Sequence, residues 1–322
     1  MRFGVVGVGY WGKNIVRNLL RIPEVSELFI YDTDNKAINK IKPTYPILKI
    51  VNDFDELLNI KDIQGIFIIT PPETHYELGL KVLERGINLY IEKPFVLKSD
   101  HANILINKAK EKNLTLMSGH TFLYSSPVIK IKELIDEGEI GKIEYISFRR
   151  INLGIHQQAV NVVWDLLPHD LSMILYWLGE DIKFIEGKSF LKTSFGKHPD
   201  VASIHLKFEN EILCEGLLSW LSPKKMRETI IIGNKKMIIY NDTEPEEKIK
   251  IYDKKVEELE PQTFGEYQLS YRIGDVISPR LNTTEPLFLM INDFINSIKL
   301  NKEPKSNGNL GLKVSEIIER IL

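Results

Sequence analysis

The residues with the clearest chemical potential are three glycines close to the start of the chain, Gly7, Gly9 and Gly12. They end an apolar run, Phe3–Val8, and precede a helical pattern over Lys13–Arg21. In a strand–turn–helix of this kind, the first glycine permits a tight turn and the second lets the backbone approach a pyrophosphate. The third lets helix and strand pack closely, and the helix start offers N–H groups to the phosphates. The spacing therefore predicts a dinucleotide-binding turn.

An acid follows at the distance that such a turn requires. The apolar run Leu28–Asp32 ends in Asp32, about 20 residues past the last glycine, where a carboxylate accepts hydrogen bonds from the adenosine ribose. Lys36 is the first basic residue after it, so a 2′-phosphate would meet a carboxylate with no adjacent cation. The sequence predicts NAD as the cofactor in preference to NADP.

A lysine follows a later strand pattern. Glu92-Lys93-Pro94 comes directly after the apolar run Asn88–Glu92, and an ammonium there can reach a substrate hydroxyl beside a nicotinamide. It would stabilise alkoxide character as a hydride leaves. Because cis-proline is found in tight turns, we expect a cis Lys93–Pro94 peptide.

Asp165 and His169 are four residues apart and share one face if their segment is helical. Pro168 suits the first turn of a helix, so we expect the helix to start here, with Asp165 at or just before the N-cap. A histidine with a pKa near neutrality suits proton transfer from an alcohol, and a nearby carboxylate can orient it or bind a sugar hydroxyl.

The elements that would position these residues fall into two groups. Over the first 120 residues, strand patterns alternate with helical ones, which predicts a doubly wound parallel sheet. The expected strands are Phe3–Val8, Leu28–Asp32, Gly65–Thr70, Asn88–Glu92 and Leu114–Ser118. The helical stretches lie near Lys13–Arg21, Asp53–Leu58, Thr74–Arg85 and Ser99–Lys112. Ligands bind such sheets at the carboxyl ends of the strands.

The pattern then changes to strands that follow one another without helices. We expect an α+β domain with an open, mainly antiparallel sheet. Its strands are predicted at Ile143–Asn152, Lys183–Leu191, Val201–Phe208, Ile212–Trp220, Thr229–Ile232, Met237–Tyr240 and Lys248–Tyr252. Its helices are predicted at Pro127–Glu137, Asp165–Leu178, Leu287–Ile298 and Leu310–Ile321, with a solvated hairpin and loop region over Glu244–Pro261. The predicted domains are a Rossmann domain over residues 1–122 and a substrate and oligomerisation domain over residues 123–322.

Composition limits the classes of partner. The net charge of −2 gives no long-range attraction for nucleic acid or an anionic membrane. No apolar run reaches the roughly 18 residues of a membrane span, and the chain enters its first strand without a signal peptide. Cys214 is the single cysteine, and no HExxH motif is present, so neither an internal disulfide nor a metal site is predicted. We expect a cytoplasmic protein.

Taken in order, several motifs resemble the Gfo/Idh/MocA family of oxidoreductases along nearly the whole chain. They are the glycine turn, Thr70-Pro71-Pro72-Glu73-Thr74-His75, Glu92-Lys93-Pro94, Gly119-His120, Trp164–Asp170 and Glu285-Pro286-Leu287. The resemblance implies a Rossmann domain, a bound nicotinamide cofactor and an open-faced sheet that often mediates oligomerisation. In that family a Lys, an Asp and a His form the catalytic group, and the matching positions are Lys93, Asp165 and His169.

One departure narrows the substrate class. Many family members carry paired glycines ahead of the Asp, whereas this chain reads Asn161-Val162-Val163-Trp164. Together with Tyr10–Asn14 and Gly119–Tyr124, this form resembles the branch that acts on nucleotide-linked sugars, including UDP-N-acetylglucosamine and its uronic acid. The resemblance implies oxidation at C3 of such a sugar.

The remaining site residues are predicted from their places after strand ends. Those expected at the cofactor, beside the glycines and Asp32, are Tyr10, Trp11, Thr70, Pro71, Pro72, His75, Glu92, Lys93 and His120. Those expected at the substrate are Lys93, Arg150, Asn152, Trp164, Asp165 and His169, with Arg150 as a candidate cation for a diphosphate.

Two other functions stay open from the sequence. One is a free-sugar or cyclitol dehydrogenase, and the other is a non-catalytic dinucleotide-binding regulator. Retention of Lys93, Asp165 and His169 favours an enzyme over a regulator. Because many apolar residues occupy Val201–Phe208 and Ile212–Trp220, we expect an exposed apolar sheet face and a homodimer or homotetramer.

Overall fold

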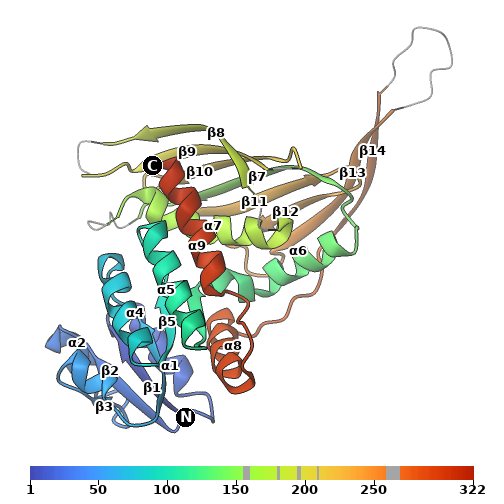
Figure 1. The fold of residues 1–322 in the computed structure, drawn as a ribbon. Coiled ribbons are helices and arrows are strands. Elements are labelled where there is room, and N and C mark those ends of the chain that lie inside the picture. The colour runs from blue at the N-terminus through green and yellow to red at the C-terminus, as the bar shows by residue number, and fades with distance from the viewer. Residues whose placement is uncertain (155–159, 180–181, 194–196, 209, 259–268) are drawn as a thin grey trace, which may run out of the picture. The chain divides into compact units, whose positions relative to one another are not determined.

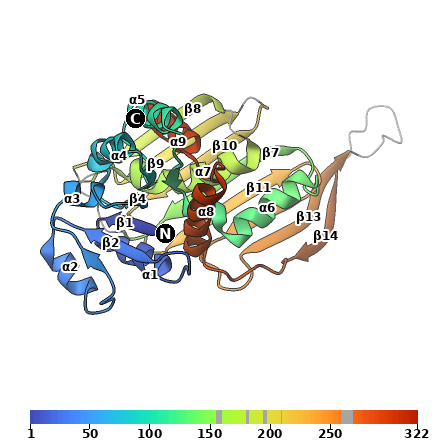
Figure 2. The ribbon, with the colours of Figure 1, turned by 60° about the horizontal axis from the view of Figure 1, so that its bottom comes forward.

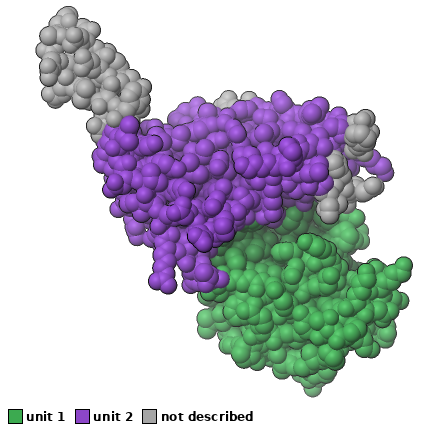
Figure 3. All heavy atoms as spheres, turned by 180° about the vertical axis from the view of Figure 1, so that it is seen from behind, with its two compact units in different colours: residues 1–125, 284–320, 322 green, residues 126–283, 321 purple. Residues whose placement is uncertain are grey.

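The computed structural model describes residues 1–154, 160–179, 182–193, 197–208, 210–258 and 269–322. The chain divides into two compact units, which Figure 3 draws in different colours. Unit 1 comprises residues 1–125, 284–320 and 322, and unit 2 comprises residues 126–283 and 321.

Unit 1 contains a parallel sheet of six strands in the order β3-β2-β1-β4-β5-β6 (Figure 1). The strands are β1 Arg2–Val6, β2 Glu27–Tyr31, β3 Lys49–Ile50, β4 Ile63–Ile68, β5 Asn88–Glu92 and β6 Leu116–Gly119. The helices between them are α1 Gly12–Leu19, α2 Asn35–Ile41, α3 Phe54–Leu58, α4 His75–Glu84 and α5 Ser99–Glu111. Short 3₁₀ turns lie at Pro72–Thr74 and Thr121–Tyr124. The doubly wound sheet predicted from the sequence is confirmed.

The strand order determines where a ligand can bind. The chain turns outward from β1 in both directions, to β2 on one side and to β4 on the other. In doubly wound sheets the crevice at this reversal, outside the carboxyl ends of the strands, is the ligand site. The central strands are buried on both faces, as the apolar runs Val5–Val6 and Ile66–Ile68 require.

Two late helices, α8 Pro286–Leu300 and α9 Gly308–Ile321, fall almost entirely in unit 1. The sequence analysis had assigned them to the second domain. Glu285, which precedes α8, pairs with Arg17 and Arg21 of α1 and accepts a hydrogen bond from Asn18. Sequence periodicity identified both helices, but only these long-range contacts assign them to a unit.

Unit 2 contains an eight-stranded sheet in the order β14-β13-β12-β11-β7-β10-β9-β8. Its strands are β7 Ile143–Ile151, β8 Ile182–Leu191, β9 Val201–Phe208, β10 Leu213–Ser219, β11 Met226–Gly233, β12 Met237–Asn241, β13 Ile249–Glu258 and β14 Leu269–Ile277. Neighbours pair antiparallel, except that β10 pairs parallel with β7. The α+β prediction is confirmed, and strand β13 lies within the predicted hairpin and loop region Glu244–Pro261.

The helices α6 Ser126–Asp136 and α7 Val162–Leu178 lie on the same face of this sheet (Figures 1 and 2). The indole of Trp177 donates to the carbonyl of Val128 and ties the two helices together. Along β9, Ala202, Ile204, Leu206 and Phe208 are buried and the alternate residues are half-buried. Most apolar side chains of Val201–Phe208 therefore point away from the open face, contrary to the expectation from the sequence.

Within the part of the chain that the structure describes, no helix is long and apolar enough to span a membrane.

Candidate active site

The glycine turn after β1 has the geometry that the sequence predicted. Gly7 has a φ of +92°, which favours glycine, and a Cβ there would lie 2.7 Å from the carbonyl oxygen of Ile69. A Cβ at Gly12 would lie 2.0 Å from the carbonyl oxygen of Gly7. A Cβ at Gly9, by contrast, meets no described atom within 4 Å. Gly7 and Gly12 are thus required by the protein's own packing, and Gly9 leaves open space where a pyrophosphate fits.

Asp32 is fixed toward this turn. One carboxylate oxygen accepts the N–H of Val8 at 2.7 Å, and the other accepts the N–H of Asp34 at 2.8 Å. Each carboxylate oxygen keeps a second lone pair for a ribose hydroxyl. The arrangement fits the adenosine ribose of NAD, with Asp32 and the three glycines holding the nucleotide.

Glu92 connects the glycine turn to the end of β5. Its buried carboxyl accepts hydrogen bonds from the Trp11 indole at 2.6 Å, the Tyr90 hydroxyl at 2.9 Å and the main-chain N–H of Lys93 at 2.7 Å. Burial raises the pKa of Glu92, and the hydrogen bonds oppose that shift. A Cβ at Gly119 would lie 2.9 Å from this carboxyl, so β6 also requires a glycine here. Tyr10, in the same turn, is largely exposed.

Lys93 is half-buried at the carboxyl end of β5, and the Lys93–Pro94 peptide is cis, as expected. The nearby His120, after β6, is buried, and neither ring nitrogen has a hydrogen-bond partner among the described residues. Burial and the Lys93 charge lower the pKa of His120 to about 3. A neutral, unpartnered imidazole beside an ammonium is suited to hydrogen-bond a polar ligand.

His75, the first residue of α4, differs from its predicted role at the cofactor. Its Nδ1 lies 2.9 Å from the carbonyl oxygen of Pro94, and its Nε2 lies 2.8 Å from that of Thr70. Both ring nitrogens are thus directed at main-chain carbonyls of the protein. Pro71 and Pro72 lie in the loop between β4 and α4, which contains the 3₁₀ turn Pro72–Thr74.

In unit 2, α7 begins three residues earlier than the sequence predicted. Asn161 is the N-cap, and its side chain accepts the N–H groups of Val163 and Trp164, both at 3.0 Å. Pro168 consequently lies inside the helix and not in its first turn. An asparagine followed by an apolar run is a helix-capping signal. The sequence prediction missed it because Pro168 was expected in the first turn of the helix.

Asp165 and His169 lie on one face of α7, four residues apart, and both are half-buried among fully buried neighbours. The Asp165 carboxylate accepts a hydrogen bond from the Trp220 indole at 3.1 Å. Trp164, predicted at the substrate, is buried, and Asn152 follows β7 with its main chain bonded to Ser219. The structure therefore brings Asp165 and His169 together within unit 2, while Lys93 belongs to unit 1.

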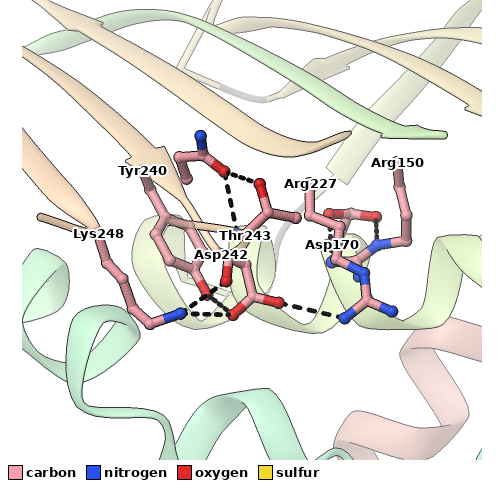
Figure 4. Close-up of polar contacts among 8 residues, drawn as sticks. Arg150, Asp170, Arg227, Tyr240, Asp242, Thr243 and Lys248 are labelled. Carbon is pink, nitrogen blue, oxygen red and sulfur yellow. Dashed lines mark hydrogen bonds and ion pairs between the residues drawn. The ribbon is translucent and has the colours of Figure 1, made fainter. Parts of the chain in front are cut away.

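Arg150 differs from the prediction of a phosphate-binding cation. Its guanidinium is buried and bidentate to Asp170 of α7, at 2.6 and 2.9 Å (Figure 4). On the neighbouring strand Arg227 pairs with Asp242 at 3.2 Å. Along β7 the side chains of Ile146, Phe148 and Arg150 are buried, and the bond to Asp170 directs Arg150 toward α7. This pairing was not predicted from the sequence.

Among the described residues, no group of three or more His, Cys, Asp or Glu side chains is placed to hold a metal ion.

The fold and the glycine turn define a dinucleotide-binding Rossmann domain, followed in the chain by an α+β unit. Two family models agree: one for an oxidoreductase family with an NAD-binding Rossmann fold matches residues 1–120, and one for the Gfo/Idh/MocA C-terminal domain matches residues 128–239. The chain belongs to the Gfo/Idh/MocA family of oxidoreductases.

Three relatives illustrate the sequence similarity between this chain and known oxidoreductases. An uncharacterized oxidoreductase of Streptococcus pneumoniae is 27% identical over 72% of this chain and 65% of that protein. The myo-inositol 2-dehydrogenase of Thermotoga maritima is 24% identical over 66% of each. The UDP-N-acetylglucosamine 3-dehydrogenase of Acidithiobacillus ferrooxidans is 27% identical over 56% of this chain and 55% of that protein.

The chain thus spans less than two thirds of the length of each of these relatives. The solved structure of the Acidithiobacillus ferrooxidans enzyme superposes with a TM-score of 0.81 at 20% identity, covering 100% of this chain and 96% of that one. At that identity the superposition establishes the shared fold.

Proposed function

We propose that this protein is an NAD-dependent dehydrogenase that oxidises the C3 hydroxyl of a nucleotide-linked sugar, such as UDP-N-acetylglucosamine or its uronic acid. The observation that carries the proposal is the setting of Lys93. It stands at the carboxyl end of β5, and its main-chain N–H is held by Glu92, the same carboxyl that holds Trp11 of the glycine turn. A cation is thereby tied to the turn that binds the cofactor.

In the proposed chemistry, the alcohol loses its hydroxyl hydrogen as a proton and the hydrogen on its carbon as a hydride. His169 accepts the hydroxyl proton, and the Lys93 ammonium stabilises the negative charge that develops on the oxygen. Asp165 orients His169 or a sugar hydroxyl, and the neutral His120 beside Lys93 hydrogen-bonds the bound ligand. NAD, held by the glycine turn and Asp32, would supply the acceptor for the hydride of the carbon, so that the alcohol is oxidised to a ketone.

The nucleotide-linked substrate is supported by the start of α7. Asn161 caps the helix through two N–H groups and Trp164 is buried, in the segment whose sequence resembles the branch that acts on nucleotide-linked sugars. The relative that acts on UDP-N-acetylglucosamine supports the same class.

A free-sugar or cyclitol dehydrogenase is the second candidate, because a myo-inositol 2-dehydrogenase is a relative at comparable identity.

Transfer of deuterium tests the proposed function. UDP-N-acetylglucosamine and its uronic acid, each labelled with deuterium at C3, are incubated with the enzyme and NAD, and the cofactor is analysed by mass spectrometry. Mass increase of the reduced cofactor by one deuterium supports C3 oxidation. Unlabelled NADH contradicts the position, and NADH from myo-inositol alone favours the second candidate.

A further inference from the structure

Two loops at the carboxyl edge of the parallel sheet meet at one buried imidazole, that of His75. The residue is fully buried at the start of α4. Its Nδ1 lies 2.9 Å from the Pro94 carbonyl oxygen and 3.2 Å from that of Phe95, while Nε2 lies 2.8 Å from the Thr70 carbonyl oxygen. The three carbonyls come from the loops after β4 and β5.

Each loop adjoins a different part of the proposed site. The Thr70 loop packs against the glycine turn, since a Cβ at Gly7 would lie 2.7 Å from Ile69 O and 3.2 Å from Thr70 N. The other loop carries Lys93 immediately before Pro94. A shift of either carbonyl therefore moves one ligand-binding backbone relative to the other.

The chemistry of the contacts makes the two sides separable. Carbonyl oxygens only accept, so a neutral imidazole donates a hydrogen bond to one loop and contacts the carbonyl of the other, and only the imidazolium donates to both. Burial lowers the pKa of His75, and the carbonyls oppose that shift, as does the charge of Glu73. The amide nitrogen of asparagine takes the place of Nδ1, and that of glutamine takes the place of Nε2, so each amide preserves one side alone.

We propose that His75 is a positioning residue that holds the cofactor loop at Thr70 and the Lys93 turn in register. Because it acts through Lys93 and the bound nucleotide, this role rests on the proposed function. Both ring nitrogens of His75 are directed at main-chain carbonyls of the protein.

The test separates the two loops with paired substitutions. In His75→Asn the polar contact toward Pro94 remains and that toward Thr70 is lost. We expect NAD to bind about tenfold more weakly, the effect of one hydrogen bond, with kcat within about threefold of wild type. In His75→Gln the opposite holds: NAD affinity is kept and kcat falls at least about tenfold. His101→Asn, which removes a histidine stacked on Tyr76, is the control and should leave both values unchanged.

A measurement that needs no sugar substrate tests the role of His75 separately from the proposed function. The rate at which Lys93 is acetylated by a chemical reagent, followed by mass spectrometry, should change several-fold in His75→Gln and stay constant in His75→Asn. If wild type makes no NADH with any sugar, the proposed function fails, while NAD affinity and acetylation still test His75. Equal changes in both variants that follow their melting temperatures, or no change in either, would overturn the positioning role.

Discussion

The ammonium of Lys93 is the group on which the proposed chemistry depends most. Lys93→Met removes the charge but keeps much of the side-chain volume. Loss of one electrostatic stabiliser of the developing oxyanion should lower kcat by about 10²- to 10³-fold, with NAD affinity unchanged. Steady-state kinetics and calorimetric NAD titration measure the two effects. Lys98→Met, at an exposed lysine of the same loop, is the matched control and should keep wild-type kinetics.

Asp32 should determine the choice between NAD and NADP. Its carboxylate is already directed at the glycine turn by the N–H groups of Val8 and Asp34. Asp32→Asn keeps the size of the side chain and removes the charge that repels a 2′-phosphate. The ratio of the NADP and NAD dissociation constants should fall at least about tenfold, or about 1.4 kcal/mol. An unchanged ratio would show that Asp32 does not face the ribose.

His120 should make the fold sensitive to acid. Its pKa is lowered from 6.5 to about 3 in the folded state, so between these values the unfolded chain binds a proton that the folded chain does not. Stability from this residue is therefore complete above pH 6.5 and is lost as the pH falls. From pH 6.5 to 5.5 the loss is about 1 kcal/mol, which His120→Gln should remove. Urea unfolding at both values tests this, with His198→Gln as the control for loss of a histidine.

At the scale of elements, helix α7 is fixed by its cap and by a buried ion pair. Arg150 and Asp170 bond each other through two hydrogen bonds away from solvent. Removing one partner leaves a buried charge, so Arg150→Met or Asp170→Leu alone should cost about 3–5 kcal/mol. The double variant should cost clearly less than the sum of the two. Denaturant unfolding gives these values, and additive losses would contradict direct coupling.

Most strands and helices could be predicted from the sequence because apolar runs and glycine turns are local signals, whereas α2, β3 and β14 were not predicted. Asn88–Glu92 and Val201–Phe208 were predicted with their observed bounds. The start of α7 was missed because Pro168 was expected in the first turn, although Asn161 provides the cap. The hydrogen-bond partners of Arg150 and His75 could not be predicted, because the sequence does not show which distant carboxylate or main-chain carbonyl a side chain contacts.

At the scale of the molecule, α8 and α9 return to the first unit after the chain has passed through the second. Phe294 of α8 packs edge-to-face against Phe67 of β4, and Ser306 bonds to Ser118 of β6. The unit that would bind the cofactor is therefore made from both ends of the chain. Periodicity identifies such helices without showing where they pack.

We expect the protein to be a homodimer or a homotetramer. The apolar residues of β9 point inward, but β14 exposes Ile273, Val276 and Ile277, and β8 exposes Phe190 and Leu191. Exposed apolar side chains on neighbouring positions favour association. Sedimentation velocity at micromolar protein should show one species of at least twice the chain mass. A single monomeric species would contradict this expectation.

NADH formation from a panel of sugars is the most direct test of the proposed dehydrogenase activity. Wild type and Lys93→Met are each mixed with NAD and, in turn, UDP-N-acetylglucosamine, its uronic acid, other UDP-linked sugars, free sugars and myo-inositol. We expect NADH absorbance to increase with a UDP-linked sugar in the wild type and at least about a hundredfold more slowly in Lys93→Met, although both bind NAD. NADH formation by Lys93→Met at the wild-type rate, or no NADH from any sugar while NAD binds, would contradict the proposal.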